Sequence, residues 1–301
     1  MLHREAMRFG LVTPIVTRHP ANDAAWTEDA GPAELLEIAT TADRLGYHHL
    51  TCSEHVAIPT SIGPARGSRY YDPLATLGFL AARTLRIRLV THVLVLGYHH
   101  PLAIAKRYGT LDRLSGGRLV LGVGVGTLAE EFALLGVPFT DRGARYEDAL
   151  RALRAAFGRR APSYAGTHYR FADVLVDPCG VQSAVPIWLG GRTPRSLRRA
   201  LLLGDGWDPF GLDLPQLRAL LERARGSRAW QERTAPFALV LPIDVLLDPT
   251  EAPERDRLAE RCEAYRALGT TVLNLRLRHR SLQHYVEQLD VIAREIAPRF
   301  A

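Results

Sequence analysis

The sequence predicts an α/β protein with a (β/α)8 barrel, and three observations support that fold class. Apolar, strand-like runs alternate with helical patterns along the chain, and about eight such runs can be counted. The length of 301 residues suits one barrel domain, which we expect to span residues 1–301 with loop insertions at its C-terminal face. The G-x-G-x-x-G pattern of dinucleotide-binding sheets does not follow the first strand, which argues against a doubly wound open sheet.

The stretch over residues 85–126 is the centre of this pattern. Residues 87–96 are almost continuously apolar, which is typical of a strand buried on both faces. Pro101 marks the start of a helix, Gly116 and Gly117 lie at its end, and residues 118–124 return as a second buried strand. The two strands and the helix therefore form a right-handed βαβ unit, and ligands of parallel α/β folds bind where such strands end.

The other elements repeat this alternation on both sides of the central unit. Before it, we expect strands over residues 8–13 and 47–52, helices over 33–45 and 73–83, and a polar loop up to residue 31 over the barrel mouth. After it, we expect strands over 186–189, 206–210, 237–247 and 271–275, and helices over 129–135, 142–157, 194–203, 214–224, 254–268 and 282–296. Residues 159–185 form an irregular excursion from the barrel, with short β pieces at 168–171 and 174–176.

Composition excludes several classes of function. The formal net charge is +6, but the basic residues are mainly arginines spread among acids, so we expect no nucleic-acid partner. No apolar run approaches the ~20 residues of a membrane span, and the N-terminus lacks the apolar core of a secretion signal, so we expect a cytoplasmic protein. Cys52, Cys179 and Cys262 are too widely spaced to indicate a disulfide framework or a zinc site, and we expect no metal.

The second strand is followed directly by two candidate catalytic residues, Glu54 and His55. Catalytic groups of barrels collect at such strand ends, and histidine can donate or accept a proton near neutral pH. The alternative is a solvated histidine in a surface loop. The loop over residues 56–71 is long enough to be a lid or disordered, and its Tyr70 and Tyr71 are candidate substrate contacts.

Glycine-rich stretches follow two other strands. Residues 122–127 read GVGVGT, where glycines allow a flat or charged ligand to approach the backbone, although they can equally make a tight turn. Gly190-Gly191-Arg192-Thr193 precedes a helix that starts at Pro194. Two glycines, a cation and a hydroxyl at a helix N-terminus are typical of a phosphate site, and a plain βα turn is the alternative.

With these residues in hand, the chain resembles the luciferase-like monooxygenase superfamily, and within it the F420-dependent oxidoreductase branch of actinobacteria. The resemblance covers roughly residues 8–207. The matching segments are Ser53-Glu54-His55, residues 87–101, TLDRLSGGR at 110–118, GVGVG at 122–126, residues 131–138, IWLGG at 187–191 and GDGW at 204–207.

This resemblance implies a barrel that holds a deazaflavin (coenzyme F420) or a flavin (FMN) at its C-terminal face. It implies a non-proline cis peptide in the third strand, which would fall at His92-Val93, and it places His55 near the reactive ring. The cofactor-binding residues it implies are Thr91, His92, Val93, Gly124, Gly126, Thr127, Gly190, Gly191, Arg192 and Thr193.

One position departs from the resemblance. Some F420-dependent dehydrogenases carry a glutamate just after the glycine pattern as a proton donor, whereas this chain has Thr127. Sugar-phosphate dehydrogenation is therefore doubtful, and His55, Glu54 or a loop tyrosine has to supply the acid. Arg278 follows the last strand at the barrel mouth, where it meets an anionic substrate or the acidic tail of F420, or is solvated.

The first hypothesis is an oxidoreductase that transfers a hydride between F420 and a small-molecule or peptide substrate. Reduction of an activated C=C or C=N bond in natural-product biosynthesis fits such a cofactor. An FMN-dependent monooxygenase is the second hypothesis, and a cofactor-free binding protein is the third. Members of this superfamily are often dimers, so we expect a homodimer.

Overall fold

A closed barrel of parallel strands forms the centre of the computed structural model, which describes residues 6–18 and 24–301. Each strand pairs with its neighbours in the order β3-β2-β1-β11-β10-β9-β8-β5, and β5 pairs with β3 to close the ring. The strands are β1 (Arg8–Leu11), β2 (His49–Cys52), β3 (Arg88–Thr91) with its continuation β4 (Leu94–Val95), β5 (Leu119–Gly124), β8 (Ile187–Gly190), β9 (Gly206–Asp208), β10 (Ala238–Pro242) and β11 (Val272–Leu275). The predicted (β/α)8 barrel is confirmed.

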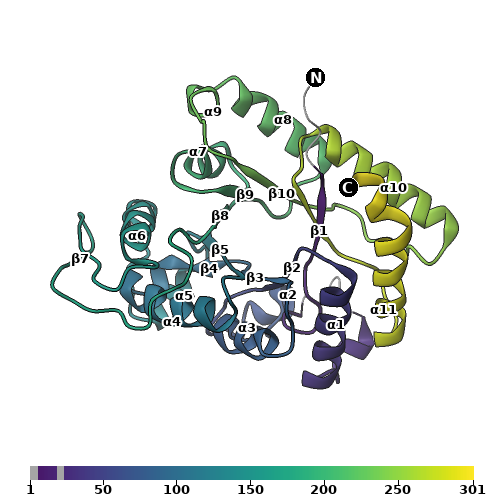
Figure 1. The fold of residues 1–301 in the computed structure, drawn as a ribbon, viewed down its shortest axis with the longest axis horizontal. Helices are drawn as coiled ribbons and strands as arrows, with labels where there is room; N and C mark the ends of the chain where they lie inside the picture. Colours follow the sequence, from purple (N-terminus) through teal and green to yellow (C-terminus); the bar gives the residue numbers. More distant parts are fainter. Residues whose placement is uncertain (1–5, 19–23) are drawn as a thin grey trace.

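Helices between the strands surround the barrel, as Figure 1 shows. Prolines begin four of them, where the missing N–H costs no hydrogen bond. The helices are α1 (Pro32–Leu45), α2 (Gly63–Arg66), α3 (Pro73–Ala81), α4 (Pro101–Leu114), α5 (Ala129–Leu134), α6 (Arg142–Ala156), α7 (Pro194–Leu203), α8 (Leu214–Arg225), α9 (Arg228–Gln231), α10 (Ala252–Ala267) and α11 (Leu282–Val291). Short helices η1 (Ala25–Thr27), η2 (Leu96–Tyr98) and η4 (Ala297–Phe300) and a π-helical turn, η3 (Ile292–Ile296), complete the described helical structure.

The hydrophobic core has two parts because side chains alternate across each strand. Leucines such as Leu89 and Leu119 face the helices and belong to the large outer cluster. Inward-facing residues from five strands form a smaller cluster inside the barrel: Val90, Val120, Trp188, Val240 and Val272. All six residues of β5 are buried, as expected for a parallel strand covered on both faces.

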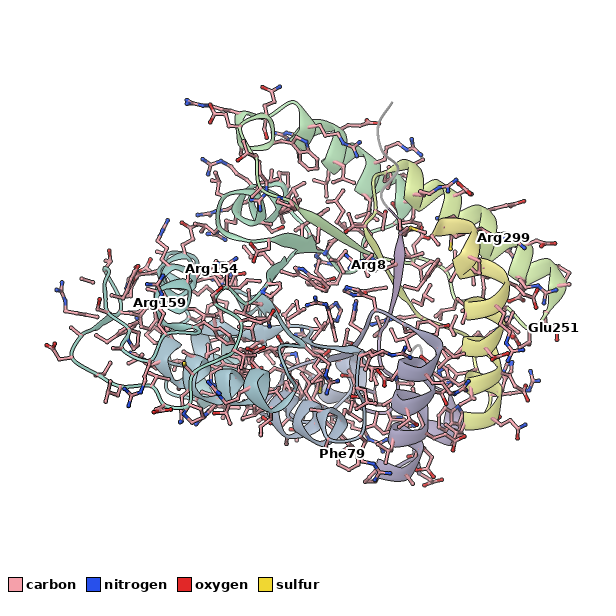
Figure 2. The ribbon with its side chains drawn as sticks, viewed as in Figure 1. Arg8, Phe79, Arg154, Arg159, Glu251 and Arg299 are labelled. Carbon is pink, nitrogen blue, oxygen red and sulfur yellow. The ribbon has the colours of Figure 1, made fainter. Side chains whose placement is uncertain are left out.

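Arginine side chains lie on several sides of the molecule. Arg154 and Arg159 lie on one side and Arg299 on the opposite side in Figure 2. Among residues 6–18 and 24–301, no helix is long and apolar enough to cross a membrane.

Three predicted strands differ from those observed. The apolar run at 87–96 is two strands rather than one, because the backbone leaves the ladder at His92-Val93, a non-proline cis peptide at the position that the resemblance implied. The run at 237–247 forms a continuous strand only from Ala238 to Pro242, and beyond it only an isolated bridge joins Leu247 to Leu277. Residues 174–176 form no strand, and the β piece of the excursion instead pairs β6 (Tyr164–Ala165) with β7 (Arg170–Phe171).

The long loop after β2 is an ordered segment with one short helix, α2, in its middle. Its end pairs with the segment after β1, through a β-bridge between Thr17 and Tyr70 and a backbone hydrogen bond from Arg18 to Arg69. The guanidinium of Arg69 donates to the carbonyls of Thr27 and Glu28 at 2.6 and 2.7 Å. The polar loop expected before residue 31 is described only in part, since residues 19–23 lie outside the described residues.

Two buried carboxylates attach the excursion, seen beside α6 at the edge of Figure 1, to the barrel helices. Asp148 on α6 accepts hydrogen bonds from the Tyr164 hydroxyl and from the N–H groups of His168 and Tyr169, at 2.6 to 3.1 Å. Asp112 on α4 is fully buried and accepts from the N–H groups of Val181 and Gln182 at 2.8 and 2.9 Å.

We expect the Asp112→Ala variant to lose about 2–4 kcal/mol of unfolding free energy, because buried N–H groups of the excursion lose their acceptor. Urea unfolding followed by circular dichroism measures this loss. Asp256→Ala on the exposed side of α10 is the matched control and should leave the midpoint unchanged. Equal midpoints for the two variants would contradict the role given to Asp112.

Candidate functional site

The candidate site lies where β2, β4, β5, β8 and β9 end, at the C-terminal face of the barrel. His55 follows β2, and its Nδ1 lies 2.6 Å from Oε2 of Glu131, which α5 contributes. The Tyr70 ring packs edge-on against the His55 ring, with centroids 4.5 Å apart. The His55 side chain is 14% exposed, so a bound molecule can reach it while the protein holds its orientation.

Glu131 is fully buried and receives four hydrogen bonds. Its Oε2 accepts from the Tyr98 hydroxyl at 2.7 Å as well as from His55, and its Oε1 accepts from the N–H groups of Val56 and Ala57 at 2.6 and 3.2 Å. Burial alone would raise the pKa of Glu131, but the hydrogen bonds from Tyr98 and His55 outweigh burial and lower it. Burial and the neighbouring carboxylate raise the pKa of Tyr98, which therefore stays a neutral donor.

Glu54 has a different place from the one expected for a catalytic acid. Its Oε2 accepts from the N–H of Val95 at 2.6 Å, and its Oε1 lies 2.6 Å from Nε2 of His99. The side chain is 5% exposed, and both of its oxygens are engaged. The direct catalytic role predicted for Glu54 is therefore corrected to one of positioning, in which it holds the end of β4 at Val95 and the His99 ring.

The third histidine of the site, His92, belongs to the cis peptide itself. Its Nε2 lies 3.3 Å from Oδ1 of Asp208, which also accepts from the Asn274 amide at 3.2 Å. The carbonyl of His92 accepts a hydrogen bond from the Ser53 hydroxyl at 2.8 Å. Within the described residues, the second carboxylate oxygen of Asp208 is buried without a hydrogen-bond donor.

Val93 faces two glycines of neighbouring strands. A Cβ placed on Gly124 would lie 2.6 Å from Val93 Cγ2, and one on Gly190 would lie 3.0 Å from Val93 Cγ1. Both distances are shorter than ordinary van der Waals contact, so a larger residue at either position would displace Val93. The Val93 side chain therefore packs closely against both glycines, and we call these three residues the Val93 cradle.

The predicted phosphate site lies at the N-terminus of α7, a ten-residue helix. Thr193 is the N-cap: its hydroxyl accepts from the N–H of Ser196 at 3.2 Å, while its own N–H donates to the Ser196 hydroxyl at 3.0 Å. The carbonyl of Gly191 accepts from the Trp207 indole at 3.0 Å. Arg192 is exposed and its guanidinium lies over the Phe210 ring.

Three other predicted site residues have contacts that change their interpretation. Thr91 is fully buried and donates its hydroxyl to the Gly122 carbonyl at 2.7 Å, so it supports the strands and is not a cofactor contact. The guanidinium of Arg278, predicted to meet a substrate, pairs with Glu254. Tyr71 packs against the core, and its N–H donates to the Val16 carbonyl, so only Tyr70 of the two tyrosines lies at His55.

Two predicted cofactor-binding residues after β5, Gly126 and Thr127, already contact other residues of the protein. The backbone of Gly126 lies against Phe132, where a Cβ would come within 2.5 Å of the ring. Thr127 is exposed, and its hydroxyl accepts from the Arg66 guanidinium at 3.3 Å.

Five residues of the site were missed by the sequence analysis: Glu131, Tyr98, His99, Asp208 and Asn274. Apart from the neighbours Tyr98 and His99, they come from separate parts of the chain, and the folded barrel brings them to the predicted residues. The sequence does carry one indication for Glu131, because this carboxylate stands next to Phe132 in the mainly apolar segment that follows the glycine pattern. Hydrogen-bonding partners far apart in sequence carry no local pattern, which is why spacing alone did not reveal them.

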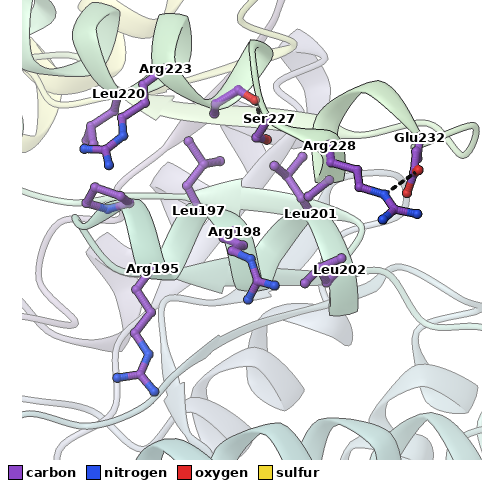
Figure 3. A pocket seen from close by; sticks show the side chains of 13 residues that line it. Arg195, Leu197, Arg198, Leu201, Leu202, Leu220, Arg223, Ser227, Arg228 and Glu232 are labelled. Atoms are coloured by element: carbon purple, nitrogen blue, oxygen red, sulfur yellow. Dashed lines mark hydrogen bonds and ion pairs between the residues drawn. The ribbon is translucent and has the colours of Figure 1, made fainter.

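The larger described groove lies elsewhere, on the outside of the barrel between α7, α8 and α9. It has a volume of about 560 Å³, a leucine-rich floor and arginines at its edge, as Figure 3 shows. It contains none of the predicted site residues. Over residues 6–18 and 24–301, no group of three histidine, cysteine or acidic side chains is arranged to hold a metal ion.

The fold places this cluster of strand-end residues at the C-terminal face of the barrel, where barrel enzymes carry their active sites. A sequence model of the luciferase-like monooxygenase family matches residues 7–296, and the chain therefore belongs to that family.

Individual relatives agree with this assignment. The chain is 31% identical over 239 residues to an F420-dependent glucose-6-phosphate dehydrogenase of Beutenbergia cavernae, covering 76% of this chain and 68% of that one. It is 30% identical over 258 residues to an uncharacterized protein of Mycobacterium tuberculosis, covering 83% and 86% of the two chains. A crystal structure of a monooxygenase from Streptomyces bottropensis has the same fold, with a TM-score of 0.79, 24% identity, and coverage of 98% of this chain and 100% of that one.

We expect the Gly124→Ala variant to lose about 1–3 kcal/mol of unfolding free energy, because the new methyl group collides with Val93. Adding Val93→Ala should restore at least half of this loss, since it removes the colliding atoms, and a double-mutant cycle in urea measures the coupling. Gly78→Ala is the control, because nothing lies within 4 Å of a Cβ there. If the two substitutions change the unfolding free energy additively, the collision with Val93 is not the cause of the loss in Gly124→Ala.

Proposed function

We propose that this protein is an F420-dependent oxidoreductase that transfers a hydride between coenzyme F420 and a small-molecule or peptide substrate. Reduction of an activated C=C or C=N bond is the reaction that we infer. The observation that carries the proposal is the Val93 cradle, where Gly124 and Gly190 leave only backbone and one valine at the end of the barrel. A flat ring fits such a surface without displacing a side chain.

The residues of the site fit a deazaflavin in two further respects. The buried Asp208 oxygen without a described donor suits the N–H of a ring, because an unsatisfied buried carboxylate oxygen is costly. The N-terminus of α7 and the exposed Arg192 suit a phosphate, through the helix dipole and the guanidinium charge. When bound, F420 supplies a ring carbon that gives or accepts a hydride, and it lacks the ring nitrogen through which flavins form oxygen adducts.

In this proposal the chain's own residues position the ring and handle the proton. The Val93 cradle supports one face of the ring, and α7 holds the phosphate end. His55 exchanges the proton that accompanies hydride transfer, and the Tyr70 ring beside it limits the access of water. The glucose-6-phosphate activity of the Beutenbergia relative is not carried over, because Thr127 stands where an acid is expected.

An FMN-dependent monooxygenase is the second candidate. The family name and the fold of the Streptomyces monooxygenase favour it, and a helix N-terminus with an arginine suits the FMN phosphate as well. The two candidates differ in their ring and in the use of oxygen, so direct binding separates them.

Fluorescence titration of the purified protein with F420 and, in parallel, with FMN tests the proposal. We expect a dissociation constant for F420 at least tenfold below that for FMN. The reverse order would support the monooxygenase, and binding of neither would support a cofactor-free barrel and overturn both candidates.

We expect the His55→Ala variant to slow oxidation of reduced F420 by 2-cyclohexen-1-one by ~100-fold or more, the usual scale for loss of an acid–base group. Its F420 affinity should stay within about threefold of the wild type, because the Val93 cradle and α7 are unchanged. His168→Ala on the excursion controls for the loss of an imidazole elsewhere. Wild-type turnover in His55→Ala would remove His55 from the mechanism.

A further inference from the structure

His55 has two ring nitrogens, and the structure assigns them different tasks. Nδ1 lies 2.6 Å from Glu131 Oε2, while Nε2 has no hydrogen bond within the described residues. The hydrogen bonds of Glu131 keep its carboxylate in the ionised form, which accepts hydrogen bonds but donates none. A proton must therefore lie on Nδ1 to make the observed contact.

We infer that Glu131 is a positioning residue that holds the Nδ1 proton of His55, so that His55 exchanges protons with the substrate only through Nε2. This inference rests on the proposed function for its catalytic meaning. The arrangement itself depends on side chains of this chain alone.

The geometry around Glu131 supports positioning in a second way. Its Oε1 binds the N–H groups of Val56 and Ala57, the two residues that follow His55. One carboxylate therefore fixes both the ring and the backbone of the loop that carries it. Tyr98 from η2 donates to the same oxygen as His55, which stops the carboxylate from rotating away.

The neighbouring charged and titratable groups do not compete for Nδ1. Glu54 and His99 are paired with each other at 2.6 Å. Arg66 donates to Thr127, and Tyr70 contacts the His55 ring edge-on. Glu131 is thus the only described carboxylate that contacts the His55 ring.

The proton balance follows from this assignment. In the direction of reduction, bound reduced F420 would supply a hydride to one carbon of the C=C or C=N bond. The π electron pair takes the proton from Nε2 of the His55 imidazolium. His55 becomes neutral, and its Nδ1 proton stays on the ring, hydrogen-bonded to Glu131. Solvent then returns a proton to Nε2.

Nitrogen-15 NMR of the protein with labelled histidine, without cofactor, tests the assignment. At a pH where His55 is neutral, we expect its signals to report the Nδ1–H tautomer almost exclusively. In Glu131→Gln the side-chain amide can donate to Nδ1 as well as accept from it. The ratio of the Nδ1–H to the Nε2–H tautomer should therefore fall at least tenfold. Glu130→Gln, the exposed neighbour on α5, removes the same charge without touching His55 and should keep the wild-type ratio.

A His55 found mainly as the Nε2–H tautomer in the wild type would overturn the inference, and so would a wild-type ratio in Glu131→Gln. The wild-type spectrum decides the tautomer even if Glu131→Gln does not fold. A second variant, Tyr98→Phe, keeps the carboxylate and should retain the Nδ1–H form; its loss there would also contradict the inference. The spectra need no cofactor, so a failed F420 titration would reject the proposed function and leave this assignment standing.

With cofactor and 2-cyclohexen-1-one, Glu131→Gln should lower kcat tenfold or more with little change in KM, because it alters proton transfer and not substrate binding. Glu130→Gln should leave both constants unchanged. An increase in KM alone would assign Glu131 to substrate binding and overturn the positioning role.

Discussion

The close approach of Val93 to its neighbouring strands is the constraint on which the site depends. The third barrel strand breaks at His92-Val93, so Val93 turns toward β5 and β8. Only glycine leaves room at the facing positions, Gly124 and Gly190. A side chain at either position would collide with Val93 and displace the residue that we propose supports a flat ring. The glycine patterns of two separate βα units therefore serve one proposed function.

Buried carboxylates fix the loops around that surface. Asp43 illustrates the device: it accepts from the N–H groups of Leu85, Arg86 and Ile87 at 2.6 to 2.9 Å, and although burial raises its pKa, these hydrogen bonds lower it overall. Glu131 uses the same device at the site. A carboxylate with several N–H donors can stay charged in the interior, and its many acceptor positions hold loops that a hydrophobic contact would leave mobile.

In the proposed function, this arrangement explains how the proton donor can differ between members of one family while the position of the site stays the same. Thr127 stands where some F420-dependent relatives have a proton donor, and it pairs with Arg66. His55 is the group that we propose as the acid, and Glu131 already orients it. In the proposed chemistry, the proton donor is therefore a histidine instead of a carboxylate.

The sequence by itself determined the barrel and the strand ends that carry the site, because hydrophobic periodicity and helix-starting prolines are local signals. The motif resemblance also located the cis peptide at His92-Val93. Only the tertiary structure decided which side chains meet: it paired His55 with Glu131 and Glu54 with His99, buried Thr91, and joined Arg278 to Glu254. The partners in these contacts are 24 to 76 residues apart, and barrel closure, which no local pattern encodes, brings them within hydrogen-bond distance.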